Sequence, residues 1–432
     1  MSRKEYFKKS LKIAWPAVLE FFFVSIAGII DTFMVSSLGP AAIAAIGLTT
    51  QPKFLALSVF FAINAAVSAL IARRQGEGKR DKANITLTTA LYIMVFFVIA
   101  VDLLMIPFAN QILYFAGSNT ETHQLAYDYY IIIMIGMFFN SLSMLINAGH
   151  RGCGNTQIAF ISNLVSSLVN ICLNYLLIDG KFGFPKMGVR GAALATVLGT
   201  VVATIMCLIS LINKDSYMNF KTMAKNKFKF SLKIAGEIKN LAVNLFVENV
   251  SARVGFMITA ITAARLGTEA FAAHNVGMNL LSISFSFGDG MQVAAIALTG
   301  NALGAGLKDE ARKLGKSCQE LGFIFSVIIS LIMIFFGRNI FSIFFSENHI
   351  LDMGVLISRF LTIIVLLQIS QVIYGGCLRA AGDVKYTLGV ALVSVTFIRS
   401  IVTLICVNVL KLGLAGIWIG ILSDQASRFI SL

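Results

Sequence analysis

Carboxylates that lie inside apolar runs are the residues of this sequence best suited to chemistry. Glu20 and Asp31 lie in one such run, at 20–39, and Glu248 lies in another near the middle of the chain. An ionisable group inside a membrane is costly, so it is by default a candidate functional residue. Because burial disfavours the charged form of a carboxylate, proton binding and cation binding come to compete there. The expected chemistry is reversible binding of a proton or a cation.

The spacing of Glu20 and Asp31 places both on one stripe of a helix. Their separation of 11 residues is three helical turns with a remainder of about 20°. Facing lipid, each acid would cost about 2.5–3.5 kcal/mol, so the stripe should face protein or water. We predict that Asp31 is the ion-coupling acid. For Glu20, a substrate or proton site and a structural role both stay open. The alternative for either acid is burial against hydroxyls such as Thr32 and Ser36.

Four other charged residues in predicted membrane spans are candidates: Glu248, Arg253, Asp289 and Arg399. Glu248 is a candidate substrate or proton site, with a structural ion pair as the alternative, and Asp289, between two glycines, has the same two interpretations. Arg253 follows Glu248 by five residues and points about 140° away from it on a helix. We therefore expect Arg253 to pair with another helix, and Arg399 to be a structural counter-ion.

Amide and hydroxyl side chains form a second candidate group. Asn170 and Asn174 are one helical turn apart, and Thr196 lies in the next predicted span. Their oxygens suit a hard cation, although such residues also join helices inside membranes. A site for a cation or a polar substrate group and a structural role between helices both stay open for these three residues. The sequence has no metal-ligand spacing, phosphate-binding loop or catalytic constellation, so we predict no enzyme, no metal site and no cofactor beyond H⁺ or Na⁺ as the coupling ion.

The elements that must position these residues are membrane-spanning helices. Hydrophobic residues make up 57% of the chain and charged residues 13%, against about 25% charged in soluble domains, and the mean hydropathy is +0.82. Apolar runs of about 20 residues predict an all-α polytopic membrane protein with twelve transmembrane helices. We place them at roughly 12–36, 53–73, 86–108, 127–149, 157–178, 190–212, 236–263, 278–301, 318–344, 354–377, 386–409 and 413–431.

The basic residues predict the orientation of these helices. A net charge of +14 would suit a nucleic-acid-binding protein, but Lys and Arg gather in loops on alternate sides of the predicted spans. Basic loops mark the cytoplasmic side, so we predict a cell-membrane protein with both termini in the cytoplasm. Lys53 is predicted to lie on the non-cytoplasmic side of the membrane, at the edge of its span. The basic segment 213–235 is interpreted as a linker helix on anionic lipid rather than a nucleic-acid site.

The sequence repeats itself at a shift of 228 residues. Shared hydrophobicity does not explain the loop glycines and polar residues that the shift aligns. The aligned pairs include Glu20 with Glu248, Gly39 with Gly267, Gly78 with Gly306, and R-G-C-G-N at 151–155 with R-A-A-G-D at 379–383.

The repeat predicts two pseudo-symmetric six-helix lobes around a central cleft. An even number of spans gives both copies the same orientation, and many transporters bind substrate between such repeats. We expect an amino-terminal lobe at 1–212, the linker at 213–235 and a carboxyl-terminal lobe at 236–432. At this shift Asp31 aligns with Thr259, so only the amino-terminal copy has an acid at this position.

Several motifs, taken in order, resemble the multidrug and toxic compound extrusion (MATE) family over about residues 10 to 425. Each motif is short, and their shared order carries the specificity. They include D-T-F-M-V-S-S-L-G at 31, R-R-Q-G-E-G at 73, H-R-G-C-G-N-T at 150, N-I-C-L-N at 170 and E-N-V-S-A-R-V-G at 248.

The resemblance implies a secondary antiporter in which two lobes rock to expose the cleft to either side of the membrane. Organic cations would leave in exchange for entering H⁺ or Na⁺. Asp31 matches the acid of the family's first helix, and Asn170 and Thr196 match the rest of its amino-lobe cation site. Glu248 matches the acid of the carboxyl lobe. The implied partners are small organic cations and membrane lipid, with no nucleic acid, and we expect a monomer.

Two positions depart from the family pattern. Asn174 stands where many members carry Asp, and Gln368, grouped with the substrate or proton residues, stands where some members carry an acid. The absence of an acid at both positions favours H⁺ over Na⁺ as the coupling ion. The alternative function is a flippase for lipid-linked oligosaccharide, which should have a more basic cavity than Glu20, Asp31 and Glu248 suggest. A membrane receptor without transport is a further alternative.

Overall fold

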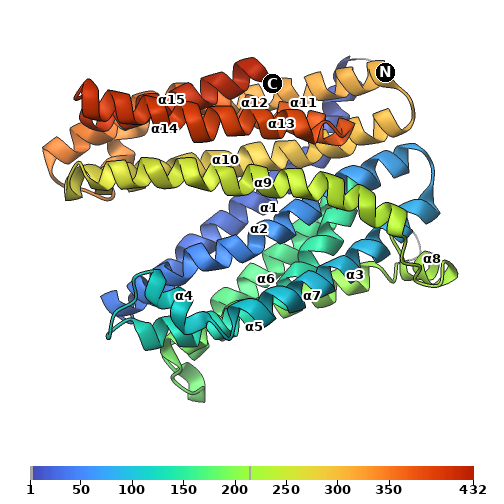
Figure 1. The fold of residues 1–432 in the computed structure, drawn as a ribbon, viewed down its shortest axis with the longest axis horizontal. Helices are drawn as coiled ribbons and strands as arrows, with labels where there is room; N and C mark the ends of the chain where they lie inside the picture. The colour runs from blue at the N-terminus through green and yellow to red at the C-terminus, as the bar shows by residue number, and fades with distance from the viewer. Residues whose placement is uncertain (1–2, 214–215) are drawn as a thin grey trace. The chain divides into compact units, whose positions relative to one another are not determined.

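The computed structural model describes residues 3–213 and 216–432, without the side chains of Thr32, Ser36, Pro40 and Thr268. This part of the chain is helical apart from short turns and contains no strand (Figure 1). The helices are α1 (Arg3–Ser36), α2 (Pro40–Gly76), α3 (Arg80–Met105), α4 (Ala109–Phe115), α5 (His123–Gly152), α6 (Thr156–Leu177), α7 (Gly188–Ser210), α8 (Phe220–Lys225), α9 (Leu232–Ala264), α10 (Thr268–Gly304), α11 (Lys308–Ser342), α12 (Asn348–Ala381), α13 (Val384–Ala391), α14 (Arg399–Leu404) and α15 (Gly413–Ser431).

Eleven helices within the described ranges are long and apolar enough to cross a membrane. One of them, Val384–Val409, is a composite helix. It consists of α13, a π-helical stretch, α14 and a second π-helical stretch, in that order. Helix α15 has the length of a span, but Asp424, Gln425 and Arg428 make it less apolar, and the first two are buried. The predicted all-α polytopic membrane fold is confirmed.

Helix α2 is longer than the sequence predicted. It begins at Pro40 rather than near residue 53 and continues to Gly76. The polar stretch Gln51-Pro52-Lys53 lowers the local hydropathy, which moved the predicted start, and Pro52 lies inside the helix although it cannot donate a backbone hydrogen bond. Lys53 therefore lies well inside α2 and not at its start, where the sequence had predicted it; its depth in the membrane stays a prediction.

The helices form two compact units. The amino-terminal unit is Leu19–Ala242, and the carboxyl-terminal unit is Met1–Val18 together with Val243–Leu432. Both boundaries fall inside helices, α1 and α9. Each unit has an apolar core of its own: the first includes Phe60, Leu87, Met94 and Tyr130, and the second includes Phe341, Ile357 and Trp418.

The segment predicted as a linker helix is mostly packed on the amino-terminal unit. Within its described part, α8, Phe220–Lys225, and the first residues of α9, from Leu232, are helical, and residues 214 and 215 lie outside that part. Asn219 caps α8 by accepting a hydrogen bond from the Thr222 amide at 2.8 Å. Met223 is buried, and α8 packs on α3.

Glycines aligned by the repeat have the same left-handed backbone in both copies. The φ angles are 95° and 112° for Gly39 and Gly267, and 70° and 77° for Gly78 and Gly306. Residues with a Cβ rarely adopt such angles. The turns before α2 and α10, and those before α3 and α11, are therefore built alike, as the repeat predicted.

Close packing of α6 against α7 holds the helices that carry the predicted ion site. A Cβ on Gly191 would lie 2.6 Å from the Leu177 carbonyl oxygen, and a Cβ on Gly199 would lie 2.8 Å from the Ser166 carbonyl oxygen. Both clashes involve backbone atoms, which cannot move aside as a flexible side chain can. Small residues are therefore required where these helices touch.

We predict that Gly191→Ala destabilises the protein because the added methyl group forces α6 and α7 apart. Overpacking of this kind costs about 1–3 kcal/mol. Gly236→Ala in α9 is the matched control in the same unit, since a Cβ there meets no atom within 4 Å. Thermal unfolding in detergent should show a lower midpoint for Gly191→Ala alone. Equal midpoints would contradict the close packing.

Candidate functional site

The structure brings together the four residues predicted for the ion-coupling site, all in the amino-terminal unit. Asp31 on α1 accepts a hydrogen bond from the Asn174 amide on α6. One turn earlier on α6, Asn170 donates to Thr196 Oγ1 on α7 at 3.2 Å. Asn170 also interacts with the Asp31 carboxylate. Asp31 is half-buried and Asn174 is fully buried. The hydroxyls of Thr32 and Ser36, the alternative partners of Asp31, lie outside the described side chains.

The partners of Asp31 suit an acid that changes its charge. The amide of Asn174 is neutral, so this hydrogen bond brings no fixed positive charge to the Asp31 carboxylate. Its Oδ1 atom is buried and has no hydrogen-bond partner among the described residues. A side-chain amide can donate from its nitrogen to an ionised carboxylate, or accept from a protonated one through its oxygen. Rotation of one amide group thus satisfies both states of Asp31.

Lys53 is a member of this site that the sequence analysis missed. It is half-buried on α2, and its positive charge acts on Asp31. The two residues do not form an ion pair within 4 Å. Because α2 already begins at Pro40, a lone Lys lies 13 residues inside an apolar helix. That position was the signal that could have identified it.

Glu20 is 2% exposed and is held by a fixed cation. Arg151, in the last turn of α5, donates to one of its carboxylate oxygens. Asn163 on α6 donates to the same oxygen at 2.5 Å. The Arg151 guanidinium also lies 5.3 Å from the centre of the Phe21 ring. The role of Glu20 in substrate or proton binding stays a prediction, while its geometry is that of a buried ion pair.

The carboxyl-terminal unit repeats this ion pair. Arg379 on α12 donates to Glu248 Oε1 at 2.6 Å, and Thr387 donates to the other oxygen at 3.2 Å. Acid and arginine are 131 residues apart in both units. The shift that aligns Glu20 with Glu248 also aligns Arg151 with Arg379, so the two ion pairs occupy equivalent positions of the repeat.

Glu248, Arg253 and Asp289 line one pocket of about 550 Å³ in the carboxyl-terminal unit. Its walls also include apolar side chains such as Phe256 and Phe285. The volume lies in the range of small-molecule sites. The pocket holds three arginines, at 253, 379 and 428, against the two acids. By its lining residues this pocket is slightly basic, and the acidic central cavity expected from Glu20, Asp31 and Glu248 stays a prediction.

Arg399 is fully buried in the carboxyl-terminal unit and has several partners. Its Nε donates to Thr259 Oγ1 at 3.0 Å, and its Nη1 lies 3.5 Å from Asp424. The guanidinium also lies 4.5 Å from the centre of the Phe256 ring. Arg428 donates to both oxygens of Asp424, at 2.9 and 3.0 Å. This acid is thus held by two fixed cations.

The repeat relates this cluster to the ion-coupling site. Thr259 is the counterpart of Asp31, and Asp424 is the counterpart of Thr196 at the same shift. Acid and threonine have exchanged places between the two units. In the carboxyl-terminal unit, the Arg399 guanidinium contacts both residues. A fixed cation therefore stands where the amino-terminal unit could bind an exchangeable one.

The structure places Gln368 in neither the ion-coupling site nor the pocket that contains Glu248. It is fully buried on α12, and neither amide atom has a hydrogen-bond partner in the described part of the chain. It does not line the pocket that contains Glu248. Its predicted role in substrate or proton binding stays a prediction without a geometric connection to the other residues.

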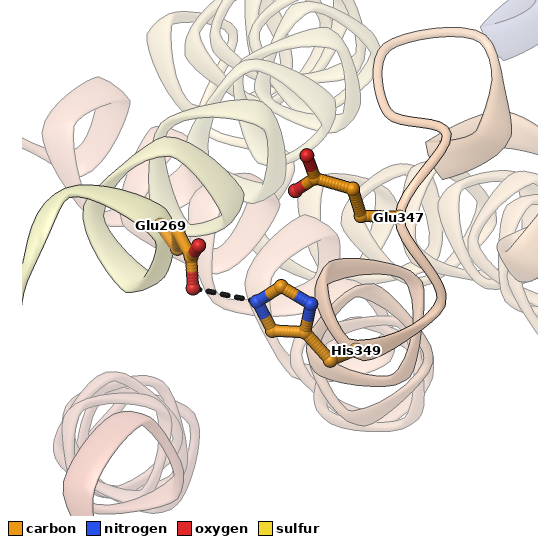
Figure 2. A group of neighbouring side chains, drawn as sticks. All are labelled: Glu269, Glu347 and His349. Atoms are coloured by element: carbon orange, nitrogen blue, oxygen red, sulfur yellow. Dashed lines mark hydrogen bonds and ion pairs between the residues drawn. The ribbon is translucent and has the colours of Figure 1, made fainter.

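One group in the described residues could hold a metal ion, although the sequence gave no such signal. Figure 2 shows Glu269 at the start of α10 beside Glu347 and His349 at the start of α12. Their ligand atoms lie within 4.8 Å of one another, and His349 Nε2 lies 2.6 Å from Glu269. All three are exposed. The His349–Glu269 contact accounts for their proximity, and we assign the group no part in the sites above.

The MatE family model matches the chain twice, at residues 16–176 and 245–405. The two segments are of equal length and coincide with the two copies of the repeat. Together they cover most of the chain.

Full-length relatives and solved structures are also similar. A protein described as a probable multidrug resistance protein NorM of Thermotoga maritima is 27% identical over 98% of this chain and 90% of its own length. The Bacillus subtilis protein of the same description is 25% identical over 99% and 95%. An outward-facing multidrug resistance MATE family transporter has a TM-score of 0.90 at 22% identity, covering 98% of this chain and 94% of that one. A MOP superfamily transporter from Pyrococcus furiosus has a TM-score of 0.90 at 21% identity, with 99% and 94% covered.

We predict that Arg151→Gln is strongly destabilising because it leaves the Glu20 carboxylate buried without its cation. Loss of one partner of a buried pair costs about 3–5 kcal/mol. The double variant Glu20→Gln/Arg151→Gln should recover most of that loss. As a control, Arg338→Gln removes one partner of an ion pair whose side chains are 51% and 70% exposed, which should cost about 1 kcal/mol or less. Thermal unfolding of the four proteins checks this, and equal losses for Arg151→Gln and Arg338→Gln would contradict it.

Proposed function

The chain belongs to the MatE family of membrane transporters, and on that premise we propose that it is a secondary antiporter that exports organic cations in exchange for H⁺ or Na⁺. Relatives described as probable multidrug resistance proteins support drugs as substrates. The observation that carries the proposal is Asp31, an acid inside a membrane-spanning helix whose direct partner is the neutral amide of Asn174. It is the buried acid best placed to exchange one cation for another.

Asp31 is the coupling acid in this mechanism. When the site faces outward, a proton or Na⁺ binds there and removes the negative charge that attracts an organic cation. The substrate is then released outside, and the protein rocks to face inward. A ligand shifts a conformational equilibrium only by its different affinity for the two states. Neutralising a buried charge supplies such a difference.

Protons suit the site better than Na⁺. The Asp31 carboxylate receives an N–H donor from Asn174, whereas a hard cation needs a shell of oxygen ligands. The site has one carboxylate, because Asn174 and Thr196 are neutral. Asn170, Asn174 and Thr196 position Asp31 and accept or donate hydrogen bonds as its charge changes. We therefore favour H⁺ as the coupling ion.

The remaining parts of the proposal concern placement in the cell. We propose that the protein is a monomer in the cell membrane with both termini in the cytoplasm. The two lobes, 1–212 and 236–432, would rock about the linker 213–235. The excess of basic residues in loops on one side of the spans supports this orientation.

A flippase for lipid-linked oligosaccharide is the second candidate. The excess of arginine over acid in the 550 Å³ pocket favours it, since a lipid pyrophosphate is an anion. Burial of Asp31 away from any arginine favours the antiporter. Movement of a labelled lipid-linked oligosaccharide by the reconstituted protein, without efflux of any cation, would decide for the flippase.

We predict that Asp31→Asn abolishes coupled efflux because an amide cannot take up a proton or hold a cation by charge. Fluorescent-cation efflux from everted vesicles or proteoliposomes should fall to the level seen without the protein. Asp352→Asn, which changes an exposed acid in the same way, is the control and should transport normally. Normal efflux by Asp31→Asn at equal expression would overturn the role of Asp31. Collapse of the pH gradient should stop wild-type efflux, and efflux that follows the Na⁺ gradient alone would overturn H⁺ coupling.

We predict that Asn174→Asp introduces a Na⁺ response. The change adds a second carboxylate beside Asp31, so the site gains a negative charge and another charged oxygen ligand. Efflux by the variant should increase when Na⁺ replaces choline outside, while wild-type efflux should not change. No Na⁺ effect in a variant that still transports would contradict this account of ion selectivity.

A further inference from the structure

A basic pocket of about 500 Å³ lies in the amino-terminal unit, away from the ion-coupling site. It is formed where α2 ends, where α3 begins and where the chain leads from α8 into α9. Its basic lining residues come from three separate segments of the sequence: Arg73, Arg74, Lys79, Lys82, Lys229 and Lys233.

The pocket has more positive charge than its own acids can balance. Two acids line it: Glu77 pairs with Lys79 at 2.8 Å, and Glu237 pairs with Arg74 at 2.5 Å. The other four basic residues make no ion pair within 4 Å among the described residues. Four like charges around one cavity repel one another, so an anion bound between them would be stabilising.

Arg74 is incompletely satisfied by the protein. It is 8% exposed, and its Nη2 donates to Glu237. Its Nη1 is buried and has no hydrogen-bond partner in the described part of the chain. A buried guanidinium nitrogen without a partner is unfavourable. Arginine binds phosphate oxygens through paired N–H groups, so a phosphate group would satisfy it.

The repeat shows that the turn between α2 and α3 does not itself require these basic residues. The same left-handed glycine turn occurs at Gly306 in the carboxyl-terminal unit. At the four positions aligned with Arg73, Arg74, Lys79 and Lys82, that unit has Asn301, Ala302, Leu307 and Glu310. The turn itself therefore does not require basic residues at these four positions; the other unit carries its basic residues at different positions, from Lys308 to Lys316.

The pocket lies at the end of one membrane-spanning helix, α2, and the start of the next, α3. Aromatic side chains near Lys229 are exposed beside it: Tyr92 is 51% exposed, and Phe228 and Phe230 are each 43% exposed. Tyr92 and Phe230 contact each other edge to face at 6.1 Å. Exposed aromatic residues at helix ends are typical of the lipid headgroup region, and basic pockets between membrane helices are known to bind phospholipid headgroups.

We propose that this pocket binds the phosphate group of an anionic ligand, either a phospholipid headgroup or a soluble phosphate compound. Arg74 contacts the phosphate, and Arg73, Lys82, Lys229 and Lys233 surround it with positive charge. The lipid would enter from the membrane between the exposed aromatic residues, and a soluble phosphate would enter from the water. This binding does not depend on the transport reaction or on its coupling ion.

The test measures ligand-induced stabilisation of the full-length protein in uncharged detergent. The probes are short-chain phosphatidylglycerol, short-chain phosphatidylcholine, inorganic phosphate and pyrophosphate. The pocket variant is Arg73→Gln/Lys82→Gln/Lys229→Gln/Lys233→Gln, which retains both internal ion pairs. The control variant is Lys308→Gln/Arg312→Gln/Lys313→Gln/Lys316→Gln, which removes the same charge from the corresponding end of α11 in the other unit. A second pocket variant, Arg74→Gln/Glu237→Gln, removes the buried guanidinium together with its acid and leaves the net charge unchanged.

We expect an anionic probe to raise the Tm of the wild type and of the control variant, with less effect at high salt. In the four-site pocket variant, half-saturation should need a much higher ligand concentration, at roughly fivefold per lost charge. Stabilisation by phosphatidylglycerol alone identifies a lipid headgroup, and stabilisation by phosphate or pyrophosphate identifies a soluble ligand. No stabilisation by any probe, or equal stabilisation of the pocket and control variants, would overturn the proposal and leave these residues a role in membrane orientation only.

Discussion

The cost of burying a carboxylate among apolar helices shapes both units. For Glu20 and Glu248 that cost is offset in the same way: each forms an ion pair with an arginine from the end of the fourth membrane helix of its repeat. Each pair connects the first helix of its repeat to a helix distant in sequence. A charge buried without its partner would be strongly destabilising, so the two members are retained together. The conserved geometry in two copies of one chain identifies these pairs as part of the fold.

The two units diverge where the ion-coupling site lies. In the amino-terminal unit the acid, Asp31, is on the first helix and the threonine, Thr196, is on the last. In the carboxyl-terminal unit these positions hold Thr259 and Asp424, and Arg399 contacts both. Because that acid already has two arginine partners, it has no need of a dissolved cation. The asymmetry supports coupling through the amino-terminal unit alone.

Much of the fold could be predicted from local sequence, because apolar runs specify membrane helices and loop glycines specify left-handed turns. Asp31, Asn170, Asn174 and Thr196 could be grouped only through resemblance to a family, since spacing does not show which helices meet. Lys53 was misplaced because hydropathy falls at Gln51 and Pro52 while the backbone remains helical. The Arg151 pair and the Glu269 group join residues far apart in the chain, and hydrophobic periodicity carries no information about such contacts.

The residues that contact each buried acid determine whether that acid is free to exchange one cation for another. The Glu20 carboxylate already has the Arg151 guanidinium as its counter-charge, so it needs no dissolved cation. The amides around Asp31, from Asn174 and Asn170, are neutral, and the Asn174 amide can turn its oxygen toward a protonated carboxyl group. Lys53 lies near enough for its charge to act on Asp31, but the two form no ion pair within 4 Å. In the proposed cycle, the acid held by amides is the one that changes charge, whereas an acid held by arginine joins helices within its unit.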